Sequence, residues 1–261
     1  MGKTEGGTAA LGEVEWRRIA GLRVVMSWPE SGYAPPPGGP ERQPPGSRPP
    51  GSLRARLAGV IGVLLIVGGG TAAGVALATQ QHAPQPSLAA AGNIGPPPFR
   101  AHGLSLSRSV PVSVAIPAIG VHSRLLHLGV DADGTIAVPS LYTEADEAAW
   151  FKYSATPGQI GASVIEGHLD SLGGPAVFFR LGALRPGDFV DVTLADGVTA
   201  VFRVTGVRQY HKTNFPAKAI YGTTDYAALR LITCGGTFDY ATGHYLSSTV
   251  VFAILTSSRG R

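Results

Sequence analysis

The only cysteine of this 261-residue chain, Cys234, ends an apolar run and directly precedes two glycines. Side chains alternate with a period of two along residues 228–233, which indicates a β-strand, and the glycines predict its end. A lone thiol cannot form an intramolecular disulfide, so Cys234 is either a small buried hydrophobic residue or a reactive nucleophile. Its place at a strand end, where a β-scaffold can present it, favours the nucleophile.

A thiol nucleophile needs a base or cation nearby, because the thiolate is the reactive form. The seven candidate histidines are His82, His102, His122, His127, His168, His211 and His244. His168 ends an apolar run and follows Gly167, so it occupies the same kind of strand end as Cys234. We therefore predict that His168 is the partner of the thiol.

These residues lie in segments that resemble the motifs of sortases. Leu231–Cys234 is similar to the strand-ending Thr-Leu-x-Thr-Cys signature, and Val164–Ser171 is similar to the histidine motif in its Gly-His-x-Asp-Ser form. Val114–Val121 and Asp133–Pro139 resemble the first two strands of that family, and Phe178–Leu181 and Leu184–Asp188 resemble its middle region. The resemblance runs from Pro111 to Ile254. Its Cys-Gly-Gly-x-Phe-Asp…Gly-His-Tyr ending is most similar to class F sortases of high-GC Gram-positive bacteria.

The resemblance implies a cysteine transpeptidase that needs no cofactor or metal. Cys234 would attack a peptide bond in a C-terminal Leu-Pro-x-Thr-Gly-like sorting motif, and His168 would act as general acid and base. The implied partners are secreted proteins bearing this motif and an amine of a cell-wall precursor or a pilin. The alternative is a non-catalytic sortase-like barrel that binds sorting peptides or wall components, although such a module has no need of an unpaired thiol.

One part of the family pattern is missing. Sortases carry an arginine on the last strand that steadies substrate and oxyanion, whereas Ser248 stands at that place here and the next basic residue is Arg259. Arg230 is the expected substitute, because residues four apart on a strand share a face, although it could equally be a solvated strand charge. The other candidates are Arg124, Arg180 and the backbone N–H groups at Gly235 and Gly236.

Asp170 lies two residues beyond His168. Its carboxylate could orient the imidazole, as carboxylates do beside catalytic histidines, and so belong to the substrate or oxyanion site. The alternative, which we favoured from the sequence, is a turn residue that caps backbone N–H groups before Gly173 and Gly174.

The chain is predicted to divide into four parts. Residues 1–56 form a Pro/Gly/Arg-rich segment that is expected to be disordered and cytoplasmic, residues 57–79 a transmembrane helix, residues 80–105 an extracytoplasmic linker and residues 106–258 the catalytic domain. Translation could begin at Met1 or at Met26.

The apolar run 57–79 is uncharged and long enough to cross a bilayer. Eight basic residues precede it, so the N-terminus is expected in the cytoplasm, with a single-pass anchor in the cell membrane. The alternative is a cleaved signal peptide with a site at Ala76-Leu77-Ala78.

The rest of the chain has the pattern of a mostly β protein. Strands are expected at 112–116, 135–138, 163–166, 189–194, 199–208, 228–233 and 249–255, and the likeliest helix at 143–151. Together with the resemblance, this predicts a sortase-like eight-stranded β-barrel with one or two short helices. From Ala83 onward 13 Lys and Arg face 12 Asp and Glu, so this part is nearly neutral and no nucleic-acid partner is expected.

Overall fold

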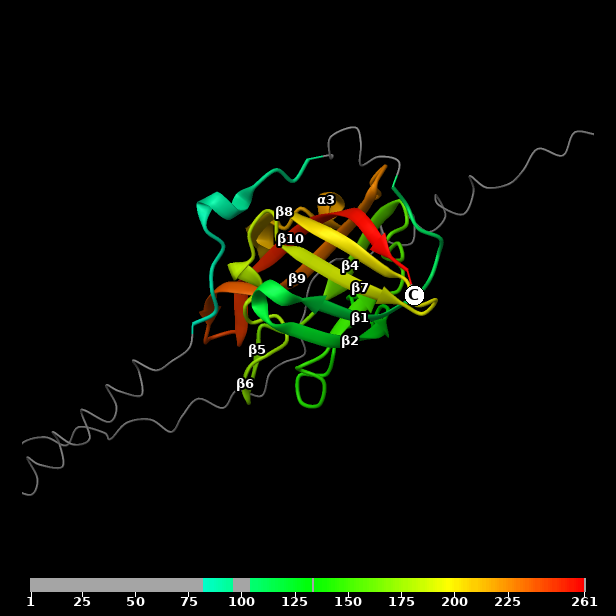
Figure 1. The fold of residues 1–261 in the computed structure, drawn as a ribbon. Coiled ribbons are helices and arrows are strands. Elements are labelled where there is room, and N and C mark those ends of the chain that lie inside the picture. Colours follow the sequence, from blue (N-terminus) through cyan, green and yellow to red (C-terminus); the bar gives the residue numbers. More distant parts are fainter. Residues whose placement is uncertain (1–81, 96–103, 133, 261) are drawn as a thin grey trace, which may run out of the picture. The chain divides into compact units, whose positions relative to one another are not determined.

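Eight strands close into a barrel in the computed structural model, which describes residues 82–95, 104–132 and 134–260 (Figure 1). Around the barrel the order is β1 (Pro111–Ile116), β2 (Val121–Leu128), β3 (Ala148–Phe151), β4 (Gly161–Glu166), β9 (Ala227–Asp239), β10 (His244–Arg259), β8 (Thr199–His211) and β7 (Phe189–Leu194), which pairs with β1. The short strands β5 (Asp170–Ser171) and β6 (Gly174–Pro175) form a separate hairpin. The predicted mostly β, eight-stranded barrel is confirmed.

Most neighbouring strands of the barrel are antiparallel, but β2 with β3 and β4 with β9 are parallel. Tight turns join the antiparallel pairs: Asp196 accepts from the N–H of Val198 between β7 and β8, and the following Gly197 has a φ of 85°. A positive φ is costly for residues with a Cβ, so glycine suits this turn. The parallel pair β4–β9 matters most for the site, because it sets the end of β4 beside the middle of β9.

The strands β4, β9 and β10 bury side chains on both of their faces. One face contributes to the barrel core, with Ile165, Leu231 and Val251 among its members. The other face packs into a second cluster, which we call the outer cluster: Ile136, Phe151, Val164, Ile220, Tyr221, Ile232, Val250 and Phe252. Ile220 and Tyr221 come from α3 (Ala217–Tyr221), in the connection between β8 and β9, so this connection covers the outside of the barrel wall.

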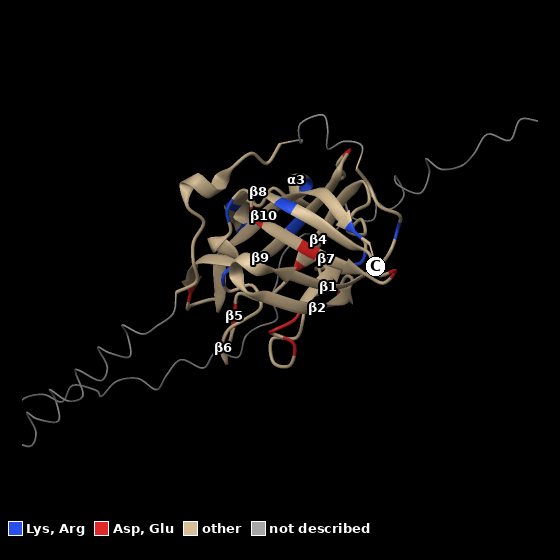
Figure 2. Ribbon diagram, in the orientation of Figure 1, with Lys and Arg blue, Asp and Glu red and all other residues tan. Residues whose placement is uncertain are grey.

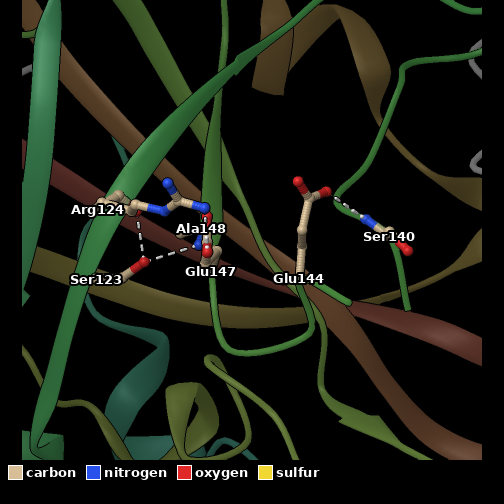
Figure 3. Close-up of polar contacts among 6 residues, drawn as sticks. All are labelled: Ser123, Arg124, Ser140, Glu144, Glu147 and Ala148. Carbon is tan, nitrogen blue, oxygen red and sulfur yellow. Dashed lines mark hydrogen bonds and ion pairs between the residues drawn. The ribbon is translucent and has the colours of Figure 1, made fainter. Parts of the chain in front are cut away.

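The helix predicted at 143–151 is wrong. Its second half is the strand β3, which pairs with β2 and β4, and its first half is a turn closed by the N–H of Glu144 on the carbonyl of Ser140, at 2.9 Å. The Glu144 carboxylate also accepts from the N–H of Ser140, at 3.0 Å (Figure 3). Glu144, one of the acidic residues that suggested a helix N-terminus, therefore caps a turn, while Ala148–Phe151 gain more by burial in the wall.

Three further elements differ from the prediction. The segment 135–138 makes only an isolated bridge between Val130 and Ile136, whereas β2 and the helix α3 were not predicted. The short 3₁₀ helices are η1 (Leu88–Ala91), η3 (Pro117–Ile119), η4 (Leu181–Ala183) and η5 (Lys212–Asn214).

Part of the predicted linker 80–105 packs on the barrel. Ala90 of η1 is buried in the barrel core, and the carbonyl of Ala91 accepts from Arg208 Nε at 3.3 Å (Figure 1, cyan). Gly92 approaches so closely that a Cβ there would lie 2.0 Å from the carbonyl oxygen of Thr205. The folded unit therefore begins before residue 106, at about Ala83.

The predicted transmembrane segment 57–79 lies outside the described residues, as do all of residues 1–81. Within 82–95, 104–132 and 134–260, no helix is both long and apolar enough to span a bilayer.

Charges of both signs are interspersed over the barrel ribbon (Figure 2). This matches the near balance of basic and acidic residues that the sequence shows after Ala83.

Candidate active site

Cys234 lies on β9, directly opposite Ser248 of β10. Side chains alternate along a strand, so the thiol shares its face with Ile232, a member of the outer cluster. The thiol therefore lies on the outer side of the barrel wall, at the margin of the outer cluster, and the residue is only 7% exposed.

His168 follows β4, the parallel neighbour of β9. Glu166 pairs with Ile232, and the N–H of Gly167 donates to the carbonyl of Ile232 at 3.1 Å. His168 lies two residues after Glu166, and Cys234 lies two residues after Ile232. Because the two strands run parallel, His168 and Cys234 lie on the same side of this last pair. The structure thus brings the two predicted catalytic residues to neighbouring positions, with His168 two residues beyond the end of β4 and Cys234 within β9. The strand end predicted at the glycines after Cys234 is wrong, because β9 continues through them and pairs with β10 as far as Asp239.

Gly167 explains why the histidine motif starts with glycine. A Cβ at this position would lie 2.7 Å from ring carbon Cδ2 of Phe178 and 2.7 Å from a methyl group of Val177. Phe178 is fully buried, and its N–H donates to the carbonyl of His168 at 2.9 Å. The middle region noted in the sequence therefore fixes the backbone of His168 by close packing.

The imidazole of His168 is oriented by a backbone carbonyl. Nε2 of His168 lies 2.7 Å from the carbonyl oxygen of Pro139. A carbonyl only accepts, so Nε2 carries the hydrogen and Nδ1 is the unprotonated nitrogen of the neutral ring. Burial lowers the pKa of His168, while the Pro139 contact and the charge of Asp170 oppose this.

The thiol is surrounded by groups of both signs. Burial raises the pKa of Cys234 to about 12. The charges of Asp170 and Glu166 raise this pKa as well, and Lys212 acts in the opposite direction. With a lowered histidine pKa, the resting pair is a neutral thiol and a neutral imidazole.

Asp170 belongs to β5 and its carboxylate accepts from the hydroxyl of Tyr245. The turn that follows is capped instead by Ser171, whose Oγ accepts from the N–H of Gly173 at 3.1 Å. The turn role favoured for Asp170 from the sequence is therefore wrong. Asp170 acts on His168 through its charge, which raises the pKa of the imidazole, and burial raises the pKa of its own carboxyl group.

The two glycines after Cys234 lie where β9 changes its register with β10, between Tyr245 and Ser247. Gly236 has a φ of 76°, and a Cβ on Gly235 would lie 2.6 Å from Thr249 Oγ1. Both positions therefore require glycine. An oxyanion role for their backbone N–H groups remains a prediction.

Arg230, the arginine expected to serve the oxyanion, has other partners. Its guanidinium lies 4.7 Å from the ring centroid of Phe252, and Nη1 donates to the carbonyl of Leu229 at 3.1 Å. The four residue steps from Arg230 to Cys234 span about 13 Å of extended strand. Phe252 is the residue of β10 that pairs with Arg230. The Arg230 guanidinium therefore packs on the ring of its own cross-strand partner and does not extend along β9 toward the thiol.

Neither Arg124 nor Arg180 takes the place of the arginine missing from the last strand. Arg124 extends to Glu147, with Nη2 2.5 Å from Oε1, and the guanidinium side chain is 67% exposed (Figure 3). Arg180 is an exposed residue before η4.

The cation that the structure places at the thiol is Lys212, whose Nζ lies 3.7 Å from Sγ of Cys234. The sequence reasoning missed it, because no local pattern links it to Cys234.

A family model of the sortase domain matches residues 114–256, which is more than half of the chain and includes both His168 and Cys234. The chain belongs to the sortase family. Sortases are cysteine transpeptidases, so the family accounts for a thiol and an imidazole at these positions. A comparison with curated proteins found no match.

Solved sortase structures are similar to this chain at low identity. Sortase A from Corynebacterium diphtheriae is 22% identical, with 58% of this chain and 62% of that chain covered and a TM-score of 0.42. The chain thus spans less than two thirds of that structure. Sortase A of Listeria monocytogenes is 18% identical, with 59% and 90% covered and a TM-score of 0.44. The SrtA sortase from Actinomyces oris is 18% identical, with 62% and 89% covered and a TM-score of 0.42.

This sortase also buries a carboxyl group beside its histidine strand. Glu166 is 2% exposed, and its Oε1 accepts from the hydroxyl of Tyr221 at 2.8 Å. Oε2 has no hydrogen-bond partner. Burial raises the pKa of Glu166 to about 7, against the Tyr221 contact, which lowers it. Tyr221 lies on α3, so this pair ties the covering connection to the wall of the sortase barrel.

We expect Glu166 to make the stability of this sortase depend on pH. Its pKa is about 7 when folded and near 4.5 when unfolded, so the folded state alone keeps the proton between these values. The contribution of Glu166 to the free energy of unfolding should therefore be fully present below pH 4.5 and be lost as pH rises to about 7, by about 3 kcal/mol. Glu166→Gln keeps an acceptor for Tyr221 and should remove this fall. Urea unfolding of the wild type and of Glu166→Gln at pH 5 and pH 7.5 measures this difference. An equal fall in the free energy of unfolding of both proteins between these pH values would contradict the prediction.

Proposed function

We propose that this sortase cleaves a Leu-Pro-x-Thr-Gly-like sorting motif through a thioester at Cys234 and transfers the protein to an amine of a cell-wall precursor or a pilin. The observation that carries this proposal is the parallel register of β4 and β9, which sets His168, just beyond the end of β4, beside Cys234 within β9. The Cys-Gly-Gly-x-Phe-Asp…Gly-His-Tyr ending supports a class F type of sortase.

The chemistry follows from the two side chains. The thiolate forms a bond from Sγ to the scissile carbonyl carbon, and the carbonyl electron pair moves to oxygen. When the tetrahedral intermediate collapses, the C–N bond breaks and the imidazolium of His168 gives its proton to the leaving amine. An acceptor amine then attacks the thioester and gives its proton to His168. The C–S bond breaks, and Cys234 leaves as the thiolate, which takes the proton back from His168.

Anchoring is part of the proposal. The uncharged run 57–79 with eight basic residues before it supports a single-pass membrane helix with a cytoplasmic N-terminus and an extracytoplasmic barrel. Protease treatment of intact cells tests it: the barrel should be cleaved from outside, and residues 1–56 should be protected.

The experiment that tests catalysis uses the full-length chain and a fluorogenic peptide containing the sorting motif. A thioester on the single cysteine should appear in the intact mass, and an added amine should convert the adduct to a ligated product. If peptide binds without forming any adduct, the proposal is overturned in favour of a non-catalytic binding barrel. The raised pKa of Cys234 and the missing last-strand arginine are the two observations that favour this second candidate.

A further inference from the structure

Lys212 is held beside the thiol by the pairing of three strands. Ser248 of β10 lies between Cys234 on β9 and Tyr210 on β8. Lys212 comes two residues after Tyr210, where β8 ends and η5 begins. It is half-buried, and its Nζ lies 3.7 Å from Sγ of Cys234. The contact thus joins positions two strands apart across the wall.

The backbone that carries Lys212 is ordered on both sides. His211 pairs with Ser247 of β10 at the last rung of β8. Its Nδ1 lies 2.8 Å from Thr213 Oγ1 and accepts from the N–H of Thr213 at 3.4 Å, which caps η5. Lys212 stands between these two residues, so the start of its side chain is fixed toward the outer face, where the thiol lies.

Lys212 is also the cation that acts on this sulfur. Three ionisable side chains interact electrostatically with Cys234: Asp170 from β5, Glu166 from β4 and Lys212 from η5. The hydroxyl of Tyr245 from β10 also interacts electrostatically with the thiol. Lys212 supplies the positive charge of this set, and the arginines considered from the sequence are engaged elsewhere or exposed.

We propose that Lys212 is a catalytic residue that takes the place of the missing arginine: its ammonium stabilises the Cys234 thiolate before attack and the oxyanion after it. The oxyanion role rests on the proposed function. The carbonyl oxygen is two bonds from the attacking sulfur, and oxyanion donors act at about 3 Å. An ammonium on a flexible four-carbon stem that already contacts Sγ can therefore reach that oxygen.

The thiolate role is tested by alkylation, which needs no peptide substrate. The full-length chain is treated with iodoacetamide between pH 6 and 10, and adduct formation on the single cysteine is followed by intact mass. Lys212→Met keeps the packing and removes the charge, so the thiol pKa should rise and alkylation below that pKa should slow about tenfold or more. Lys212→Arg keeps a charge and should restore most of the rate.

The matched control is Lys218→Met, which removes an exposed lysine from α3 in the same connection. It should alkylate at the wild-type rate. An unchanged pH profile in Lys212→Met overturns the proposal, and so does an equal slowing in Lys218→Met, because the effect would then come from overall charge.

The oxyanion role is tested by the acylation rate with sorting peptide. Lys212→Met should lose about 100-fold or more, the scale of one oxyanion donor, with Lys212→Arg partly active. Acylation by Lys212→Met that slows only as much as its alkylation overturns the oxyanion role. If the wild-type chain acylates with no peptide while its alkylation depends on Lys212, the proposed function fails and the contact of Lys212 with the thiolate is upheld.

Discussion

Replacing Cys234 by alanine is expected to abolish both cleavage of the sorting peptide and adduct formation. The chain contains no other cysteine, so no second thiol can form the thioester. The change removes one small buried side chain at the margin of the outer cluster, so the barrel should still form. Intact mass after incubation with peptide, together with a fluorescence assay of cleavage, measures the result.

Two controls make this test decisive. Thermal unfolding of Cys234→Ala should stay close to that of the wild type, since loss of activity through unfolding proves nothing about chemistry. Cys234→Ser keeps the size and polarity of the site but replaces the thiol by a much weaker nucleophile, and it should also be inactive. Undiminished turnover by the alanine variant would refute the transpeptidase proposal.

Replacing His168 by alanine should lower the cleavage rate by at least about 100-fold, the usual scale of general acid–base catalysis. The loss should also change the pH profile. Burial lowers the pKa of His168 and raises that of Cys234, so the active thiolate–imidazolium pair is a minor form. The wild-type rate should rise through the histidine pKa and fall only through that of the thiol.

The alanine variant needs no imidazolium, so its residual rate should rise with thiol ionisation and lack the alkaline fall. His122→Ala is the matched control, because His122 is an exposed histidine on β2, and it should keep wild-type activity and both limbs of the profile. Near-normal activity in His168→Ala would show that the assignment from the motif is wrong.

The barrel could be predicted from sequence because most of its strands carry their own signal. β7 shows the alternation along Phe189–Leu194 that burial on one face requires, and its bounds agree with the prediction. β3 fails this rule, since all four of its residues are buried and the acidic residues before them imitate a helix start. The packing of residues 83–95 was also missed, because a segment rich in Pro and Ala has no periodicity to read.

The site divides in the same way. Cys234 and His168 are recognisable because each closes an apolar run next to glycine, a local signal in the sequence. The glycines after Cys234 do not end the strand, because β9 continues through them to Asp239. Lys212 is not, because its contact with the thiol depends on three strands and spans 22 residues of sequence. The same holds for Pro139, whose carbonyl orients an imidazole 29 residues away. Side chains and carbonyls that reach a site from connections between strands become apparent only once the three-dimensional structure is known.

The burial of Cys234 also governs its reaction with oxidants. Peroxides attack the thiolate, and with a pKa of about 12 only about one thiol in 10⁵ is ionised at pH 7. The chain holds no second cysteine to convert a sulfenic acid into an intramolecular disulfide, so an oxidised sulfur would proceed toward the irreversible sulfinic acid. The burial that raises the pKa of Cys234 therefore also slows its oxidation.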